Sequence, residues 1–350
     1  MPKLRSAAPS LLLGTTQAGG NLTLAATAWM VSGLTPSPLL NSLLPALGAL
    51  PLLLQLKRHP KGYGLQLLAV VLLIAISLSI GPKTASQTWP LLGCYAAVVL
   101  FGFGREVSTL PIERRLLSSS NTTMQRLRRG QDMGTLVGNL LAALLFPAIR
   151  QFLPALLLLL PMTGVAARGE QSLEPVPSPL PQRLPFDPRC MLQGLVLGGL
   201  FALLALWVRQ VDGGKCFDFA MVLAAYGFGR TAVGLLPGMH QAWRYVLIAG
   251  LLLLTQTPLP PLVAVLLFIP IGALVAASDA ALVDQLKSLG DAPLRWQVLL
   301  RSGAIGGVIG SIGLGLICQL LSLGAALPLV MAGFLCLALL QAPRPAQATP

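Results

Sequence analysis

Charged residues are scarce in this chain, and acidic ones most of all. Only 10% of its 350 residues are Asp, Glu, Lys or Arg, and just 11 of these are acidic. Three stretches, residues 6–56, 245–278 and 302–343, contain no charged residue at all. Hydrophobic residues make up 55% of the chain, a balance that no water-soluble domain of this length needs. The composition therefore excludes a soluble protein and predicts an integral membrane protein.

Histidine and cysteine are also few, which limits the chemistry open to the chain. The two histidines, His59 and His240, lie in predicted loops, and the five cysteines show no Cys-x-x-Cys spacing. This pattern predicts neither a disulfide framework nor a metal site. A membrane enzyme would need His, Asp or Glu gathered near one membrane face, and no nucleotide-binding loop of the Gly-x-x-x-x-Gly-Lys-Ser/Thr type is present. We expect no catalytic residues, no cofactor and no ATP-driven step.

The long apolar runs predict twelve transmembrane spans. Each of the three uncharged stretches is too long for one crossing, since about 20 residues suffice, and each has turn-forming residues near its middle, at 32–38, 257–261 and 322–324. We interpret these stretches as three pairs of spans. The remaining six spans are 62–82, 84–104, 133–149, 151–167, 190–208 and 217–236. Lys3 and Arg5 precede an apolar run, as in a signal peptide, but cleavage would leave an odd number of spans, so we expect a retained helix.

Basic residues predict the orientation of these spans. With a cytoplasmic N-terminus, 20 of the 24 Lys and Arg residues fall on the cytoplasmic side, and only Lys83, Arg150, Arg209 and Lys215 fall outside. This bias follows the positive-inside rule and predicts a multi-pass protein of the plasma (inner) membrane with both termini in the cytoplasm. An eleven-span arrangement would lose the bias. The net charge of +13 thus reports topology and contact with the lipid bilayer, and not nucleic-acid binding.

A proline-rich segment divides the chain into two similar halves. Six prolines between positions 175 and 188 predict an extended linker. We therefore expect an N-terminal six-helix bundle over residues 1–167, a cytoplasmic linker over 168–189, a C-terminal six-helix bundle over 190–343 and a tail over 344–350. The pattern Arg129, Gly134, Gly138 recurs 172 residues later as Arg301, Gly306, Gly310. Glycines four apart share one helix face and favour close helix packing.

One segment carries a family resemblance. Residues 28–40, Ala-Trp-Met-Val-Ser-Gly-Leu-Thr-Pro-Ser-Pro-Leu-Leu, and their continuation to Pro51 resemble the first-to-second-helix segment of the exporter-like branch of the major facilitator superfamily, which includes siderophore and drug exporters. The resemblance extends loosely through 102–104, Pro111 and 271–317, about a third of the chain. It implies an all-α membrane fold of twelve helices in two pseudo-symmetric bundles, which move a small molecule by alternating access.

The chain departs from that family in two places. The loop after the second helix, residues 55–64, keeps its basic residues but lacks the usual aspartate. Arg105 and Glu106 stand where the family has small residues. These departures leave open an alternative, a non-transporting protein of the same fold that acts in membrane assembly or as a scaffold.

Ionisable residues within apolar spans are costly and indicate function. Arg105 and Glu106 lie near the cytoplasmic end of the fourth span, and Asp279 lies at matching depth in the tenth. We predict that they form a cytoplasmic gate in which Arg105 pairs with Asp279; the alternative is that all three face lipid headgroups. Asp132, at the start of the fifth span, is a candidate carrier of a coupling proton, or a residue stabilised by the helix dipole.

Four further polar residues are candidates for the substrate cavity. Gln17 and Asn21 share one face of the first span, Asn139 lies in the fifth and Arg230 in the eighth. Interhelical hydrogen bonds explain the amides equally well, and Arg230 suits either an anionic substrate or the membrane interface. Together these features predict a secondary transporter that exports a small amphipathic molecule, driven by an ion gradient and most simply by protons.

Overall fold

The computed structural model describes residues 2–54, 62–80, 87–108, 124–145, 148–168, 185–211, 213–232, 238–290 and 292–341. All regular secondary structure in these ranges is helical. The loop of residues 55–61, Pro111 and most of the expected linker, residues 169–184, lie outside them.

The described residues of the first half of the chain, up to residue 168, include six long helices. They are α1 (Pro2–Leu34), α2 (Pro38–Leu53), α3 (Gly62–Ser79), α4 (Thr88–Val107), α6 (Met124–Leu144) and α7 (Ala148–Arg168). The second half forms α8 (Pro188–Gln210), α9 (Cys216–Thr231), α10 (Gln241–Leu254), α11 (Pro261–Leu266), α12 (Phe268–Gln285), α13 (Ala292–Leu320) and α14 (Ala326–Leu340), with the short 3₁₀ helices η2 (Leu286–Leu289) and η3 (Leu323–Ala325). Only Leu267 separates α11 from α12.

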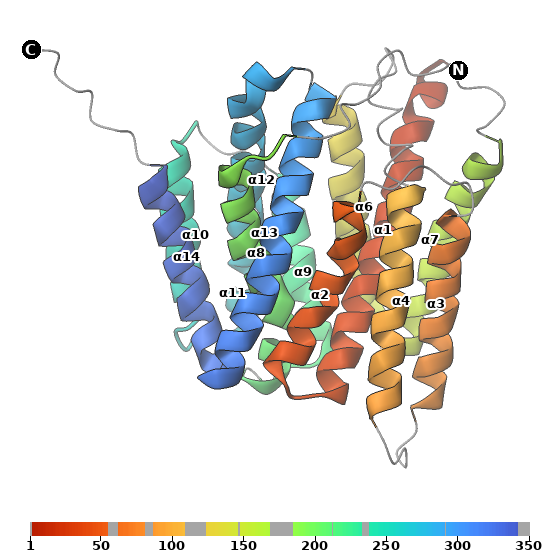
Figure 1. The fold of residues 1–350 in the computed structure, drawn as a ribbon, viewed down its shortest axis with the longest axis horizontal. Coiled ribbons are helices and arrows are strands. Elements are labelled where there is room, and N and C mark those ends of the chain that lie inside the picture. Colours follow the sequence, from red (N-terminus) through yellow and green to blue (C-terminus); the bar gives the residue numbers. More distant parts are fainter. Residues whose placement is uncertain are drawn as a thin grey trace, which may run out of the picture.

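The long helices stand side by side and run alternately up and down (Figure 1). We call the end at which α7 finishes and α8 starts the linker end, and the end at which α1 passes into α2 the far end. Helix α1 begins and α14 finishes at the linker end, which is uppermost in Figure 1. Each residue can therefore be placed by its position along its helix.

Turns break the apolar runs where the sequence predicts them. Residues 35–37 separate α1 from α2, where the Ser37 hydroxyl accepts from the Leu40 amide and Pro38 occupies the first helical turn. Helix α8 starts in the same way, with the Asp187 carboxylate accepting from the amides of Arg189 and Cys190. Local capping chemistry thus fixes these helix starts.

Two helices start nine or more residues earlier than predicted. Helix α6 begins at Met124 and not at 133, and α13 begins at Ala292 and not at 302. The predicted spans stopped at charged residues, but a charge does not end a helix when its side chain finds a partner. Arg128 donates to the Ala276 carbonyl, and Arg295 to that of Val283. Helix α9, in contrast, ends at Thr231, five residues before the predicted end of its span.

The helices have the length and the surface of membrane spans. Six stretches among the described residues are long and apolar enough to cross a bilayer: Gly62–Ser79, Thr88–Val107, Pro188–Gln210, Pro261–Leu289, Leu294–Leu320 and Leu323–Leu340. Large apolar side chains such as Leu157, Leu320 and Leu339 stay more than two-thirds exposed, which suits contact with lipid. The chain is a multi-pass membrane protein.

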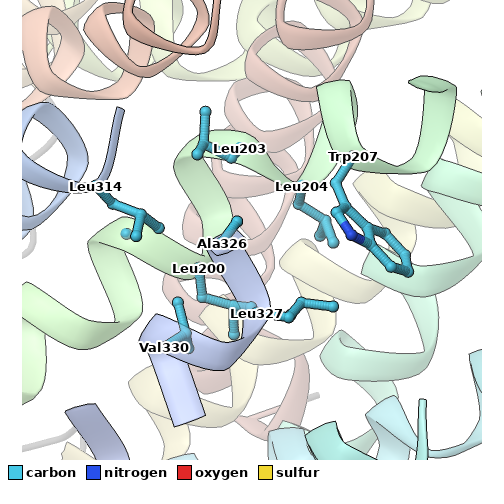
Figure 2. Close-up of a pocket in the computed structure, with 9 residues that line it drawn as sticks. Leu200, Leu203, Leu204, Trp207, Leu314, Ala326, Leu327 and Val330 are labelled. Carbon is cyan, nitrogen blue, oxygen red and sulfur yellow. The ribbon is translucent and has the colours of Figure 1, made fainter. Parts of the chain in front are cut away.

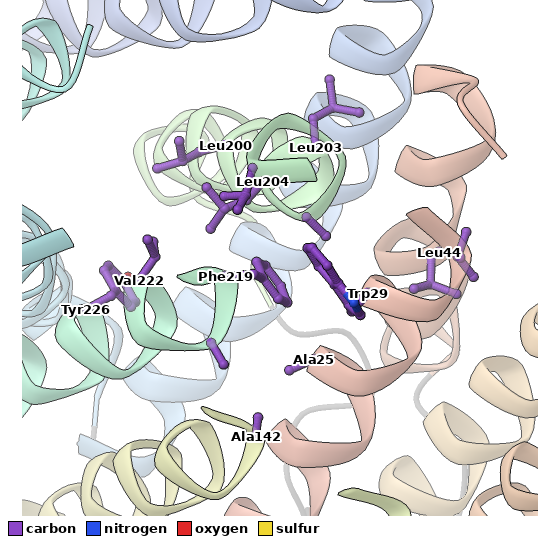
Figure 3. Packing of buried hydrophobic residues seen from close by; sticks show 14 of the residues in the cluster. Ala25, Trp29, Leu44, Ala142, Leu200, Leu203, Leu204, Phe219, Val222 and Tyr226 are labelled. Carbon is purple, nitrogen blue, oxygen red and sulfur yellow. The ribbon is translucent and has the colours of Figure 1, made fainter. Parts of the chain in front are cut away.

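Helices pack both within and across the two halves of the sequence. Helix α1 contacts α6 and α7, while α8 contacts α13 and α9 contacts α12. Across the halves, α2 contacts α13 and α6 contacts α9. Trp29 of α1, Phe219 of α9 and Leu204 of α8 belong to one buried cluster that joins both halves (Figure 3).

The repeated glycines lie at two matching contacts. A side chain at Gly134 or Gly138 of α6 would meet the backbone of α1, at Gly14 and Ala18. One at Gly306 or Gly310 of α13 would meet the backbone of α8, at Met191 and Leu195. The absence of side chains thus brings backbones together at α1–α6 and at α8–α13.

Candidate functional site

A buried group of ion pairs lies towards the linker end. Arg230, in the last turn of α9, donates from Nε to Oδ1 of Asp132 at 3.2 Å and from Nη2 to Oδ2 of Asp279 at 3.1 Å. Asp132 belongs to α6 and Asp279 to α12, and the three side chains are only 11–18% exposed. Arg230 therefore bonds a helix of the first half to its own half. We call these three residues the Arg230 cluster.

Arg128 of α6 forms a second contact with α12. Its Nη2 donates to the Ala276 carbonyl of α12 at 2.7 Å, and its Nε lies 3.8 Å from Asp132. The guanidinium also lies over the Trp296 ring of α13, 5.3 Å from the centroid. Two cations thus balance two carboxylates, an arrangement that buried charge requires.

A chain of hydrogen bonds positions Asp279 from behind. Its Oδ1 accepts from Gln193 Nε2 at 2.6 Å, and the Gln193 carbonyl accepts from the Tyr245 hydroxyl at 2.6 Å. Tyr245 in turn accepts from Gln241. Both oxygens of Asp279 are therefore bonded, one to Arg230 and the other to a buried glutamine of α8. These amides fix the orientation of the carboxylate.

The predicted pair of Arg105 with Asp279 is replaced by a different pair. In the structure Asp279 bonds to Arg230, whereas Arg105 donates to the Gln17 side chain of α1 at 3.4 Å. Matching depth on related helices does not bring side chains together. Helix α4 packs on α3 and α2, while α12 packs on α9, and Arg230 lies where α9 meets both α6 and α12. In this structure Asp279 thus meets Arg230 of α9 and not Arg105 of α4.

The other predicted polar residues are dispersed. Asn139, 5% exposed, donates to the Leu223 carbonyl and joins α6 to α9. Glu106, 2% exposed, lies one turn beyond Gly102, at which α4 approaches α2. Gln17 donates to the Asn21 carbonyl oxygen at 3.4 Å, so these two residues form one polar group with Arg105. Among the residues that the structure describes, no set of His, Cys, Asp and Glu is arranged to hold a metal.

A second contact between the halves lies at the far end, and the sequence did not predict it. Arg209, in the last turn of α8, donates from Nε to the Ser32 hydroxyl and from Nη2 to the Trp29 carbonyl, both at 3.0 Å. Its guanidinium lies 3.9 Å from the centroid of the Trp29 ring. The Trp29 ring also stacks on Phe219 of α9, 5.8 Å away between centroids (Figure 3). We call Arg209, Trp29, Ser32 and Phe219 the Trp29 latch.

A small pocket between α8, α13 and α14 has a different character. It has an empty volume of about 240 Å³, part of it open to the outside. Leu200, Leu204, Leu327 and Val330 point into it, with Trp207 at one side (Figure 2). Its lining is apolar and offers no charged group, so it lacks the polar contacts that orient a ligand.

Comparison with solved structures identifies the fold. The nucleoside transporter NupG superposes with a TM-score of 0.63 at 11% identity, covering 97% of this chain and 97% of its own. The human organic anion transporter MFSD10 (TETRAN) gives 0.56 at 14% identity, with 97% and 100% covered. A bacterial homologue of the human lysosomal transporter Spinster, inward-facing and occupied, gives 0.58 at 12% identity, with 96% and 92% covered. The chain has the major-facilitator fold. No protein family and no curated protein matches it in sequence.

Three residues of this major-facilitator fold were not predicted as site residues, although each has a recognisable feature in the sequence: Arg209, Gln193 and Arg128. Arg209 was one of the four basic residues that broke the positive-inside bias, and a cation on the wrong side needs a partner. Gln193 is an amide inside a predicted span. Arg128 was counted only as a cytoplasmic loop charge, because the start of α6 was placed too late.

Proposed function

We propose that this chain is a secondary transporter of the exporter-like type, which moves a small amphipathic molecule by alternating access. The proposal includes twelve spans in two six-helix bundles, residues 1–167 and 190–343, with the linker end in the cytoplasm. The plasma (inner) membrane is its expected location.

The observation that carries the proposal is the pair of polar contacts between the halves at opposite ends. Helix α9 takes part in both: Phe219 packs on Trp29 towards the far end, and Arg230 bonds Asp132 towards the linker end. These residues are eleven positions apart, about 16 Å along a helix. A tilt of α9 against α1 and α6 would release one contact while keeping the other. We infer that the Arg230 cluster closes the cytoplasmic side and the Trp29 latch the outer side.

The Arg230 cluster also suits coupling to a proton gradient. Arg230 is held by two carboxylates, Asp132 and Asp279. A proton on Asp279 would cancel one of the negative charges that hold the guanidinium and weaken the cytoplasmic contact. We propose Asp279 and Asp132 as the coupling residues, since no acid other than these two is paired with Arg230 among the described residues.

A counterflow assay tests this function. The purified full-length chain is placed in liposomes that are loaded with one amphipathic compound at a time, and uptake of the labelled compound is followed with and without a pH gradient. We expect saturable counterflow that empty liposomes lack, and an effect of the gradient that Asp279→Asn removes. Absence of counterflow across a broad panel would favour the alternative, a non-transporting assembly or scaffold protein.

A further inference from the structure

Arg105 of α4 and Gln17 and Asn21 of α1 form a series of hydrogen bonds. Donor and acceptor chemistry determines which atom of each side chain donates and which accepts. An arginine only donates, so the group of Gln17 that faces Arg105 must be its carbonyl oxygen, Oε1. The Gln17 amide nitrogen is then turned to Asn21 and donates to Oδ1. This leaves the Asn21 nitrogen, Nδ2, as the end of the chain. The arginine donor thus favours one orientation for both amides.

The last donor in this series of hydrogen bonds, Nδ2 of Asn21, lacks an acceptor. Nδ2 of Asn21 is enclosed by protein and makes no hydrogen bond in the structure. A buried donor without a partner is unfavourable, because it has lost water and gained nothing in return. The two hydrogen bonds that precede it, from Arg105 to Gln17 and from Gln17 to Asn21, are long at 3.4 Å each. Both are therefore weak, and the two amides can turn towards a ligand. A ligand oxygen that accepts a hydrogen bond would satisfy Nδ2 of Asn21.

The location of the group suits a ligand between the two halves. Gly14 and Ala18 of α1 face α6, Gly19 faces α7 and Gly20 faces Phe101 of α4. Gln17 and Asn21 therefore lie on the side of α1 opposite α7, and both are only partly buried. On the same face, the apolar Leu24 and Ala28 follow towards the far end and are also partly buried. The two amides on this face of α1 thus lie beside the cation Arg105 of α4, and an apolar stretch follows them towards the far end.

We infer that Arg105, Gln17 and Asn21 bind the acidic group of the substrate, so that the substrate is an organic acid with a carboxylate or phosphate and an apolar remainder. This inference rests on the proposed function and specifies its substrate class. The acid oxygens accept from Arg105 and from Nδ2 of Asn21, and the apolar part lies along Leu24 and Ala28. Arg105 is a binding residue in this account and not part of the gate.

Thermal unfolding of the purified full-length chain in a neutral detergent tests the inference without requiring transport. The probes are phenylbutyrate and phenyl phosphate, compared with methyl phenylbutyrate and phenylbutylamine. We expect the two acids to raise the melting temperature with saturation and the ester and the amine to have no such effect. In Arg105→Gln and Asn21→Leu the acid concentration at half-saturation should rise at least about tenfold, since charge-assisted hydrogen bonds are lost.

Matched variants separate binding from folding. Arg150→Gln makes the same change as Arg105→Gln at an exposed position of α7, and Gln87→Leu likewise replaces an amide with leucine at the exposed residue that precedes α4. Both variants should bind the acids as the wild type does. Asn21→Asp keeps the side-chain shape but replaces the terminal donor with a carboxylate, so it should also lose acid binding even if Asn21→Leu fails to fold.

Several results would overturn the inference: no shift with either acid, equal shifts with the ester or amine, or unchanged acid binding in Arg105→Gln and Asn21→Asp. Stabilisation by phosphatidylglycerol alone, without the soluble acids, would assign the site to a lipid headgroup and also overturn it. The two proposals fail separately. Acid binding without counterflow would remove the transport function and leave the site, whereas counterflow of phenylbutylamine without acid binding would do the reverse.

Discussion

At the scale of single residues, Arg230 stands out because it forms ion pairs with two carboxylates at the contact between the halves. It bonds two carboxylates from different helices in a site with little access to water. Breaking a buried pair is costly because the remaining charge has lost its hydration, whereas an exposed pair contributes little. The pair of Lys287 and Asp284, both about 70% exposed, provides the comparison within the same chain.

A double-mutant cycle tests this difference. We expect Arg230→Gln to lower the apparent melting temperature in detergent, and Asp279→Asn to cost less in the Arg230→Gln background than in the wild type. The coupling should amount to about 1–3 kcal/mol. The cycle of Lys287→Gln and Asp284→Asn should give less than about 0.5 kcal/mol. Equal couplings in the two cycles would mean that the Arg230 cluster is solvated and holds nothing closed.

The sequence shows which ionisable residues lie within the apolar runs, but it does not show which of them form pairs. Asp132, Arg230 and Asp279 stood out because ionisable groups are rare in the apolar runs. Their pairing could not be read, since the position of a residue along a helix says nothing about the direction in which its side chain points. Arg105 and Arg230 both stood out in the sequence, but their positions along α4 and α9 could not show which of them contacts Asp279.

At the scale of helices, the glycine contacts set how closely α1 approaches α6 and α8 approaches α13. A side chain at Gly310 would collide with the backbone of α8, and backbone cannot move aside as a flexible side chain can. Gly313, on the same helix, has nothing within 4 Å of the position where a side chain would start.

We therefore expect Gly310→Leu to prevent stable assembly or to lower the melting temperature by several degrees, since overpacking costs about 1–3 kcal/mol and more where backbone is in the way. Gly134→Leu should behave in the same way at the α1–α6 contact. Gly313→Leu should express and melt like the wild type. Size-exclusion profiles and melting curves of the three variants decide the matter, and a Gly310→Leu protein as stable as Gly313→Leu would show that the α8–α13 contact is not tight.

Helix positions were more readable from the sequence than helix ends. Proline and capping residues marked the starts of α2 and α8, because these signals act locally. The starts of α6 and α13 were misplaced by more than two helical turns. Charged residues such as Arg128 find partners on other helices, which no local pattern reveals.

At the scale of the whole molecule, the orientation in the membrane underlies the functional account. We predict from the positive-inside bias that the linker is cytoplasmic. A single cysteine at position 178, in a chain whose five native cysteines are replaced, should then react with a membrane-impermeant thiol reagent only after cells are opened. Labelling of intact cells from outside would invert the topology and with it the assignment of the two contacts to the inner and outer sides.

The repeat of glycines and the proline-rich segment predict a chain built of two similar halves. The contacts that join the halves were not visible, because the Arg230 cluster and the Trp29 latch unite residues up to 180 positions apart.

The central claim, that the two contacts close opposite sides of one path, is tested most directly by the accessibility of a cysteine at Leu24, on the face of α1 between them. Labelling is measured from each side in right-side-out and inside-out vesicles. Arg230→Gln should raise labelling from the linker side and Arg209→Gln from the far side, each relative to Lys287→Gln. If both variants raise labelling from the same side, or neither changes it, the two contacts do not act as alternating gates.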